Sequence, residues 1–188
     1  MTSITDDELR EALAAAAYLE GDFVLRSGRR SRYYLDKYRF ETRPDLLAPL
    51  GARIATAVRE LAPDAVRLAA PELGAVALAA AASLAGGLPF LIVRKEAKEH
   101  GTGKRLEGPF ETGETVCLVE DVVTSGGALL ESVEALREAG LVVRSAVCVV
   151  DREEGGTEAL ALQGVALRAI YGAGELLEGA KTPAKPHG

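Results

Sequence analysis

Apolar runs alternate with amphipathic stretches along most of this chain. The pattern predicts helices near residues 6–19, 44–61, 74–86, 127–139 and 157–163, with strands near 65–70, 90–93, 115–119, 142–150 and 165–170. Strands that are apolar throughout and separated by helices are typical of a parallel sheet covered on both faces. We therefore expect a doubly wound α/β fold, with a mostly parallel sheet flanked by helices. Ligands of such sheets bind beyond the carboxyl ends of the strands.

The first forty residues depart from this pattern. Residues 23–25 and 33–36 read as short strands on either side of a turn-rich Ser-Gly-Arg-Arg segment. We expect residues 1–40 to form the first helix and a small hood, or flap, beside an α/β core that spans 44–178. The length of 188 residues favours a single domain with a sizeable core.

Two further segments lack a regular pattern. Residues 94–113 are polar, contain glycine and interrupt the alternation of strands and helices. A loop of that length inside a compact domain is usually functional, so we expect a mobile catalytic loop there. Residues 181–188 carry two prolines and no apolar pattern, which predicts a frayed tail.

The composition narrows the classes of partner. A formal net charge of −6 argues against a surface that binds nucleic acid or anionic lipid as a whole. No stretch approaches the ~20 apolar residues that cross a bilayer, and the alanine run after Thr5 is too short for a signal peptide. Cys117 and Cys148 lie in apolar runs, where thiols are usually small buried hydrophobes. We expect a soluble cytoplasmic protein that contacts neither nucleic acid nor membrane.

The most specific chemistry follows the strand near 115–119. Glu120 and Asp121 end that apolar run, and a Thr-Ser-Gly-Gly turn at 124–127 leads into the next helix. Either feature alone fits a solvated loop start or an ordinary helix cap. Together they favour an anion site, because the glycines let main-chain amides converge on a phosphate at the positive end of the helix. The two carboxylates would then accept hydrogen bonds from ribose hydroxyls or hold water on Mg²⁺.

Other phosphate motifs do not fit this turn. No lysine follows the glycines, as it would in a Walker loop, and the G-x-G-x-x-G pattern of dinucleotide sites is absent. The stretch instead resembles the phosphoribosyl pyrophosphate signature of type I phosphoribosyltransferases, in which an acidic pair precedes a threonine-rich glycine turn.

The long loop opens with a cationic segment. Its basic side chains are Arg94, Lys95, Lys98, His100, Lys104 and Arg105. Such a run is often only a solvated face. In an acidic chain, with glycines as hinges, it also suits a lid that neutralises a pyrophosphate leaving group and keeps water from an oxocarbenium-like transition state. His100 could protonate the departing oxygen.

Three further stretches extend the resemblance: VLRSGRRSRYYLD at 24–36, RKEAKEHG at 94–101 and DREEGG at 151–156. In this order and spacing, the chain resembles the orotate phosphoribosyltransferases over nearly its full length. The resemblance implies the type I phosphoribosyltransferase fold with an N-terminal hood. It also implies transfer of a phosphoribosyl group from phosphoribosyl pyrophosphate to orotate with Mg²⁺, in a homodimer whose partner subunit contributes the lid.

The same resemblance assigns roles to residues. It implies that the catalytic residues are Lys95, Lys98, His100 and Asp121. It places the ribose on Glu120 and Asp121, the pyrophosphate on the lid that begins at Arg94, and the 5′-phosphate on Thr124, Ser125, Gly126, Gly127 and Ala128. The orotate carboxylate would pair with the planar guanidinium of Arg152, beside Arg26, Tyr33 and Tyr34. Mg²⁺ would be held mainly by the substrate, with Glu120 and Asp121 reaching it through water.

Two positions depart from the family pattern. Arg26 stands where many relatives have lysine, which preserves the charge and changes the geometry. The Pro71–Ala75 segment, PELGA, lacks the Tyr-Lys pair that some relatives have in the pyrophosphate-facing loop. Glu72 would repel pyrophosphate unless it turns away or contacts the hydrated metal.

Several alternatives stay open. Arg152 also fits an ion pair with Glu153 or Glu154, and Tyr33 and Tyr34 fit packing inside the hood as well as stacking on the base. A sensor that binds phosphoribosyl pyrophosphate without catalysis would not need the lid, and the sequence shows no appended DNA-binding helix pair. A transferase for a purine or another pyrimidine agrees less well with Arg152 and the hood.

Overall fold

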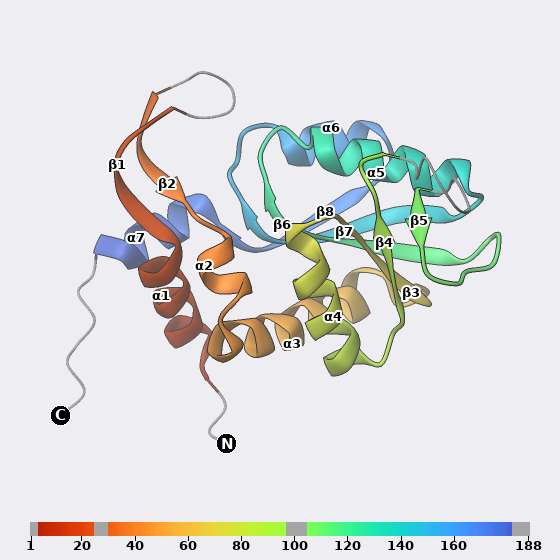
Figure 1. Ribbon diagram of the computed structural model, residues 1–188, viewed down its shortest axis with the longest axis horizontal. Coiled ribbons are helices and arrows are strands. Elements are labelled where there is room, and N and C mark those ends of the chain that lie inside the picture. The colour runs from red at the N-terminus through yellow and green to blue at the C-terminus, as the bar shows by residue number, and fades with distance from the viewer. Residues whose placement is uncertain (1–3, 25–29, 97–104, 182–188) are drawn as a thin grey trace.

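A computed structural model describes residues 4–24, 30–96 and 105–181 of the chain (Figure 1). Its centre is a six-stranded sheet of β3 (Arg67–Pro71), β4 (Phe90–Val93), β5 (Leu106–Glu107), β6 (Thr115–Val123), β7 (Val142–Asp151) and β8 (Ala166–Gly172). The strand order is β5-β4-β3-β6-β7-β8. Neighbouring strands are parallel except for β5, which pairs antiparallel with β4 at the edge. This is the mostly parallel sheet that the sequence predicts.

Helices cover both faces of the sheet (Figure 1). One face carries α3 (Pro44–Leu61) and α4 (Gly74–Gly86), and the other carries α5 (Gly127–Glu138) and α6 (Gly156–Leu162). Proline at the first position of α3 suits a helix start, because the missing amide hydrogen would have had no helical partner there. Across the described residues, no helix combines the length and the hydropathy that a membrane crossing requires.

The central strand β6 shows why the fold has two cores. Cys117 and Val119 pack in the core that includes α3 and α4, whereas Val116 and Leu118 pack in the core that includes α5. Successive side chains of a strand point to opposite faces. A strand that is apolar at every position is therefore buried on both sides, and the predicted doubly wound fold is confirmed.

The N-terminal segment forms a hood beside the sheet (Figure 1). It consists of α1 (Asp6–Ala17), an antiparallel hairpin of β1 (Tyr18–Val24) and β2 (Arg30–Leu35), and the short α2 (Tyr38–Glu41). The last helix, α7 (Ala173–Lys181), packs against α1. The hood thus combines segments from both ends of the chain.

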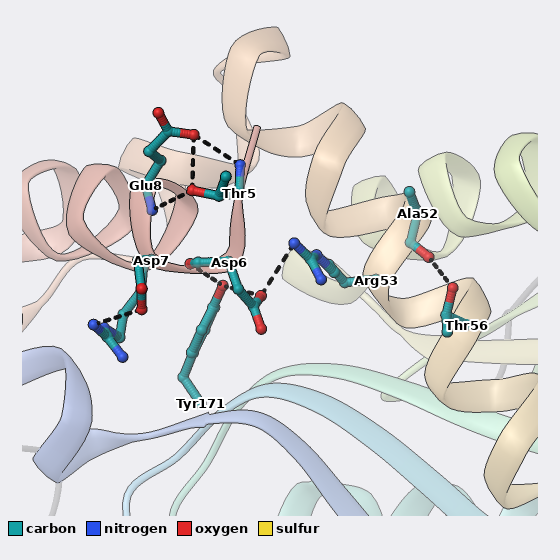
Figure 2. Close-up of polar contacts among 9 residues, drawn as sticks. Thr5, Asp6, Asp7, Glu8, Ala52, Arg53, Thr56 and Tyr171 are labelled. Atoms are coloured by element: carbon teal, nitrogen blue, oxygen red, sulfur yellow. Dashed lines mark hydrogen bonds and ion pairs between the residues drawn. The ribbon is translucent and has the colours of Figure 1, made fainter. Parts of the chain in front are cut away.

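Polar contacts fix α1 on the core (Figure 2). Thr5 and Glu8 form a capping box, in which each side chain accepts the main-chain amide of the other residue at 3.3 and 2.8 Å. The carboxylate of Asp6 accepts from the Tyr171 hydroxyl of β8 at 3.4 Å and pairs with Arg53 of α3 at 3.2 Å. Burial and the charge of Asp6 raise the pKa of Tyr171 to about 12. The hood is therefore anchored to two elements of the core.

The sequence pattern misplaced several boundaries. The first strand begins at Tyr18 rather than near residue 23, and β6 runs to Val123 rather than ending near residue 119. The hairpin partner β2 supplies the pairing that extends β1, and β7 supplies the pairing that extends β6. Three short elements were not predicted: α2, β5 and α7. The predicted tail lies outside the described residues except for Lys181, which ends α7.

Candidate active site

Three loops meet at the carboxyl ends of β3, β6 and β7. A Cβ on Gly74, after β3, would lie 1.9 Å from Asp121 Oδ2 on β6. A Cβ on Gly156, after β7, would lie 2.5 Å from the main-chain oxygen of Thr124. The loops therefore touch through glycines that leave no room for a side chain. This is the edge of the sheet where ligands of doubly wound folds bind.

The acidic pair lies inside β6 and is buried. Glu120 is 7% exposed and Asp121 is 3% exposed. The Asp121 amide donates to Glu120 Oε1 at 3.0 Å, and the Val122 amide donates to Asp121 Oδ1 at 2.5 Å. The expectation that the strand stops before the pair was wrong, because pairing with β7 continues past it. A solvated loop start is therefore excluded as the explanation of these acids.

Two residues that the sequence did not single out complete the acidic cluster. The Lys37 ammonium donates to Asp121 Oδ2 at 2.5 Å. Glu41 of α2 is 4% exposed, and its Oε1 has no hydrogen-bond partner among the described residues. Burial and the charge of Asp121 raise the pKa of both Glu41 and Glu120. The cluster thus gathers three carboxyl groups and one ammonium at the end of the sheet.

The glycine turn presents main-chain amides to solvent. Gly126 adopts a left-handed φ of 81° and precedes the first residue of α5, with no side chain capping that helix. Thr124, Ser125, Gly127 and Ala128 are exposed, and a Cβ on Gly127 would have no heavy atom within 4 Å in the part of the chain that the structure describes. The first amides of a helix have no helical acceptor. The turn therefore has open space, free donors and the positive end of α5, which together suit a phosphate.

Arg152 lies between the sheet and the hood. Its amide donates to the Val123 oxygen at 2.8 Å, and its guanidinium is 5.9 Å from the centre of the Tyr33 ring. The side chain is 12% exposed and pairs with Glu154 at 3.1 Å, as one sequence alternative proposed. Its Nε is buried without a hydrogen-bond partner among the described residues. A guanidinium with a spare donor remains suited to a planar carboxylate.

The two hood tyrosines have different surroundings. Tyr33 stacks on Tyr18 with ring centres 5.9 Å apart and also faces Arg152. Tyr34 lies against Phe23 at 5.5 Å and is 42% exposed. Tyr33 thus lies against Arg152, which directly follows β7, whereas Tyr34 packs within the hairpin.

The start of the cationic segment turns toward the edge of the sheet. Arg94 lies 4.0 Å from the Glu107 carboxylate, and its amide donates to the Arg105 oxygen at 2.8 Å. The Lys95 amide donates to Glu72 Oε1 at 2.9 Å. The Glu72 carboxylate of the PELGA segment therefore accepts a main-chain hydrogen bond through Oε1. Three predicted site residues, Arg26, Lys98 and His100, lie outside the described residues.

The acidic pair contains the kind of donor that a magnesium site requires. Carboxylate oxygens are the ligands that Mg²⁺ prefers, and it usually keeps several waters. Within the described residues, no group of three or more His, Cys, Asp or Glu side chains is arranged to hold a metal. Glu120 and Asp121 supply oxygens of the kind that bind Mg²⁺, directly or through water.

Comparisons with known proteins identify the family of this chain. The phosphoribosyl transferase domain family matches residues 48–163, which include the acidic pair, the glycine turn and Arg152. An orotate phosphoribosyltransferase of Methanocella arvoryzae is 49% identical over 92% of this chain and 97% of its own length.

Solved structures agree as well. The crystal structure of orotate phosphoribosyltransferase from Aeropyrum pernix has a TM-score of 0.79 and 34% identity, over 90% of this chain and 96% of that one. The Mycobacterium tuberculosis enzyme in complex with phosphoribosyl pyrophosphate has a TM-score of 0.74 and 31% identity, over 91% of this chain and 98% of that one. The chain therefore belongs to the phosphoribosyl transferase family and, within it, to the orotate phosphoribosyltransferases.

Proposed function

We propose that this chain transfers the phosphoribosyl group of phosphoribosyl pyrophosphate to orotate, giving orotidine 5′-monophosphate and pyrophosphate for UMP synthesis. The observation that carries the proposal is the 124–128 turn, exposed except at Gly126, beside the buried pair of Glu120 and Asp121 at the carboxyl end of β6. Near full-length similarity to an orotate phosphoribosyltransferase supports the choice of base.

Each part of the sugar donor has a matching feature. The free amides at the start of α5 suit the 5′-phosphate. The buried carboxyl groups of Glu120 and Asp121 suit the ribose hydroxyls, because their oxygens accept hydrogen bonds. The family resemblance assigns the pyrophosphate to Arg94, Lys95, Lys98 and His100.

The orotate site would lie between Arg152 and the hood. The guanidinium would meet the orotate carboxylate with the Nε donor that has no protein partner among the described residues. The Tyr33 ring would hold the Arg152 guanidinium through the contact with its face. Arg26 and Tyr34 would contribute from the hairpin.

In the reaction, the ring nitrogen of orotate gives up its proton and forms a bond to ribose C1 as the bond from C1 to the pyrophosphate oxygen breaks. The released proton balances the one that the departing pyrophosphate takes up. Lys98 would neutralise the charge that grows on the leaving oxygen, and His100 would protonate it. The family resemblance also assigns catalytic roles to Lys95 and Asp121. When bound, Mg²⁺ neutralises part of the pyrophosphate charge.

Assembly and location are also part of the proposal. The family resemblance favours a homodimer in which the lid reaches the partner's site. Cys117 and Cys148 are free buried thiols, which suits the reducing cytoplasm. A mixture of Lys98→Ala and Asp121→Asn subunits would regain activity if the lid acts across the dimer, because a mixed dimer then keeps one intact site. No recovery after subunit exchange would contradict the shared site.

The test of function is a spectrophotometric assay of orotate consumption. We expect consumption that requires both phosphoribosyl pyrophosphate and Mg²⁺ and that an excess of uracil or adenine does not slow. No consumption of orotate, or a faster reaction with another base, would overturn the proposal.

A further inference from the structure

Lys37 forms a long-range contact that joins the hood to the sheet. It stands directly before α2, and its ammonium lies 2.5 Å from Asp121 Oδ2, across 84 positions of sequence. The Lys37 side chain is 32% exposed, whereas that of Asp121 is 4% exposed. The lysine therefore reaches from a partly solvated position to a buried carboxylate.

The carboxylate of Asp121 is surrounded by other acids. Glu120 precedes it on β6, and Glu41 approaches from α2. Burial opposes the charge on Lys37, but its hydrogen bond to Asp121 and the charges of Asp121, Glu41 and Glu120 outweigh burial and raise the pKa of Lys37. Lys37 thus stays a cation in a cluster where its positive charge has three acidic neighbours.

The start of α4 fixes the position of this pair. A Cβ on Gly74 would lie 1.9 Å from Asp121 Oδ2 and 2.8 Å from Lys37 Nζ. The absence of a side chain at Gly74 therefore makes the space in which the ammonium and the carboxylate meet. Asp121 Oδ1 is held separately by the Val122 amide at 2.5 Å. Both oxygens of the carboxylate are consequently held in a defined orientation.

Building on the proposed function, we propose that Lys37 is a positioning residue for the sugar site. It holds the carboxylate of Asp121 in one orientation beside Glu41 and Glu120, so that Asp121 can accept hydrogen bonds from the ribose hydroxyls. An ion pair that must be desolvated contributes little to stability on average. The pair is therefore better explained by the orientation that it gives to Asp121 than by the stability of the fold.

The test is a double-mutant cycle on binding of ribose 5-phosphate, measured by isothermal titration calorimetry. The variants are Lys37→Met, Asp121→Asn and the double variant. Arg144→Met is the control, because Arg144 forms an ion pair with Asp64 in which both side chains are more than half exposed. Urea unfolding of each variant reports on the fold separately.

We expect Lys37→Met to raise the dissociation constant about tenfold, or about 1.4 kcal/mol at 25 °C. In the Asp121→Asn background, the same change should raise the dissociation constant by less than about twofold, because the effects of two residues that act through each other are not additive. In turnover assays, Lys37→Met should raise KM for phosphoribosyl pyrophosphate and leave KM for orotate unchanged. Arg144→Met should bind like the wild type.

Three results would overturn the inference. First, Lys37→Met could bind ribose 5-phosphate as tightly as the wild type. Second, the change could lower the affinity equally in the wild-type and Asp121→Asn backgrounds, which would mean that Lys37 contacts the ligand itself. If Lys37→Met does not fold, the comparison of Asp121→Asn with the double variant decides, and a further loss of affinity in the double variant contradicts a positioning role.

This test is independent of the base. Ribose 5-phosphate carries no base, so a wild-type protein that binds it without consuming orotate would refute the proposed function and still allow the cycle to be measured.

Discussion

Replacing Gly127 by alanine tests phosphate binding separately from the stability of the fold. Gly127 is the first residue of α5, and a Cβ there would have no heavy atom of the described residues within 4 Å. The new methyl group would be added at the start of α5, beside the amides proposed to bind the phosphate. The variant should therefore fold normally and bind a phosphate poorly.

The magnitudes follow from the surroundings of the turn. Alanine is favoured over glycine by about 1 kcal/mol inside a helix, so the unfolding free energy should stay the same or rise by up to that amount. Losing one hydrogen bond to a charged phosphate oxygen costs about 1.5–3 kcal/mol. The dissociation constant of ribose 5-phosphate should therefore rise by at least about tenfold.

The assay combines calorimetric titration of ribose 5-phosphate with urea unfolding. Gly174→Ala is the matched control, because Gly174 is the second residue of α7 and its Cβ would come no closer than 3.8 Å to another atom. The control should show a similar change in stability and an unchanged affinity. Wild-type affinity in Gly127→Ala would show that the anion is not held above this turn.

Three further predictions concern the lid, the base and the acidic cluster. Lys98→Ala should lower kcat by orders of magnitude and leave the urea midpoint unchanged, because the lysine should act in the transition state. Near-normal turnover would exclude Lys98 from the mechanism. Arg152→Ala should raise KM for orotate and spare KM for the sugar donor, and equal losses would contradict the base site. Burial first, then the charge of Asp121, raises the pKa of Glu41 from 4.5 to about 8. Between these values the folded state binds more protons than the unfolded state, so stability should fall as pH rises through that window. The difference between the urea midpoints at the two ends of this pH window should be smaller in Glu41→Gln than in the wild type. An equal difference would exclude Glu41 as a source of the pH dependence of stability.

The main features of the fold could be predicted because they depend on local pattern. The apolar runs that became β6 and β7 are buried on both faces, and such runs predict a parallel sheet without knowledge of the partner strands. The glycine turn was found because its hydroxyl and glycine residues are adjacent in sequence. Their position at the start of α5 follows from the helical pattern after them.

Features that depend on distant partners could not be predicted. Lys37 meets Asp121 across 84 positions, and nothing around Lys37 distinguishes it from a surface lysine. The acidic pair interrupts the apolar run, so the sequence pattern predicted an end of β6 that was too early. Pairing with β7 carries the strand past these acids. The two residues of β5 are too few for a pattern. Likewise, the direction of the Glu72 side chain depends on the main-chain amide of Lys95, which follows β4.

A crystal structure with bound orotidine 5′-monophosphate would test most directly where the sugar phosphate is held. We predict the phosphate within hydrogen-bonding distance of the main-chain amides of residues 126–128, with the ribose hydroxyls on Glu120 and Asp121. A phosphate bound elsewhere, or hydroxyls that contact neither carboxylate, would contradict the proposed site.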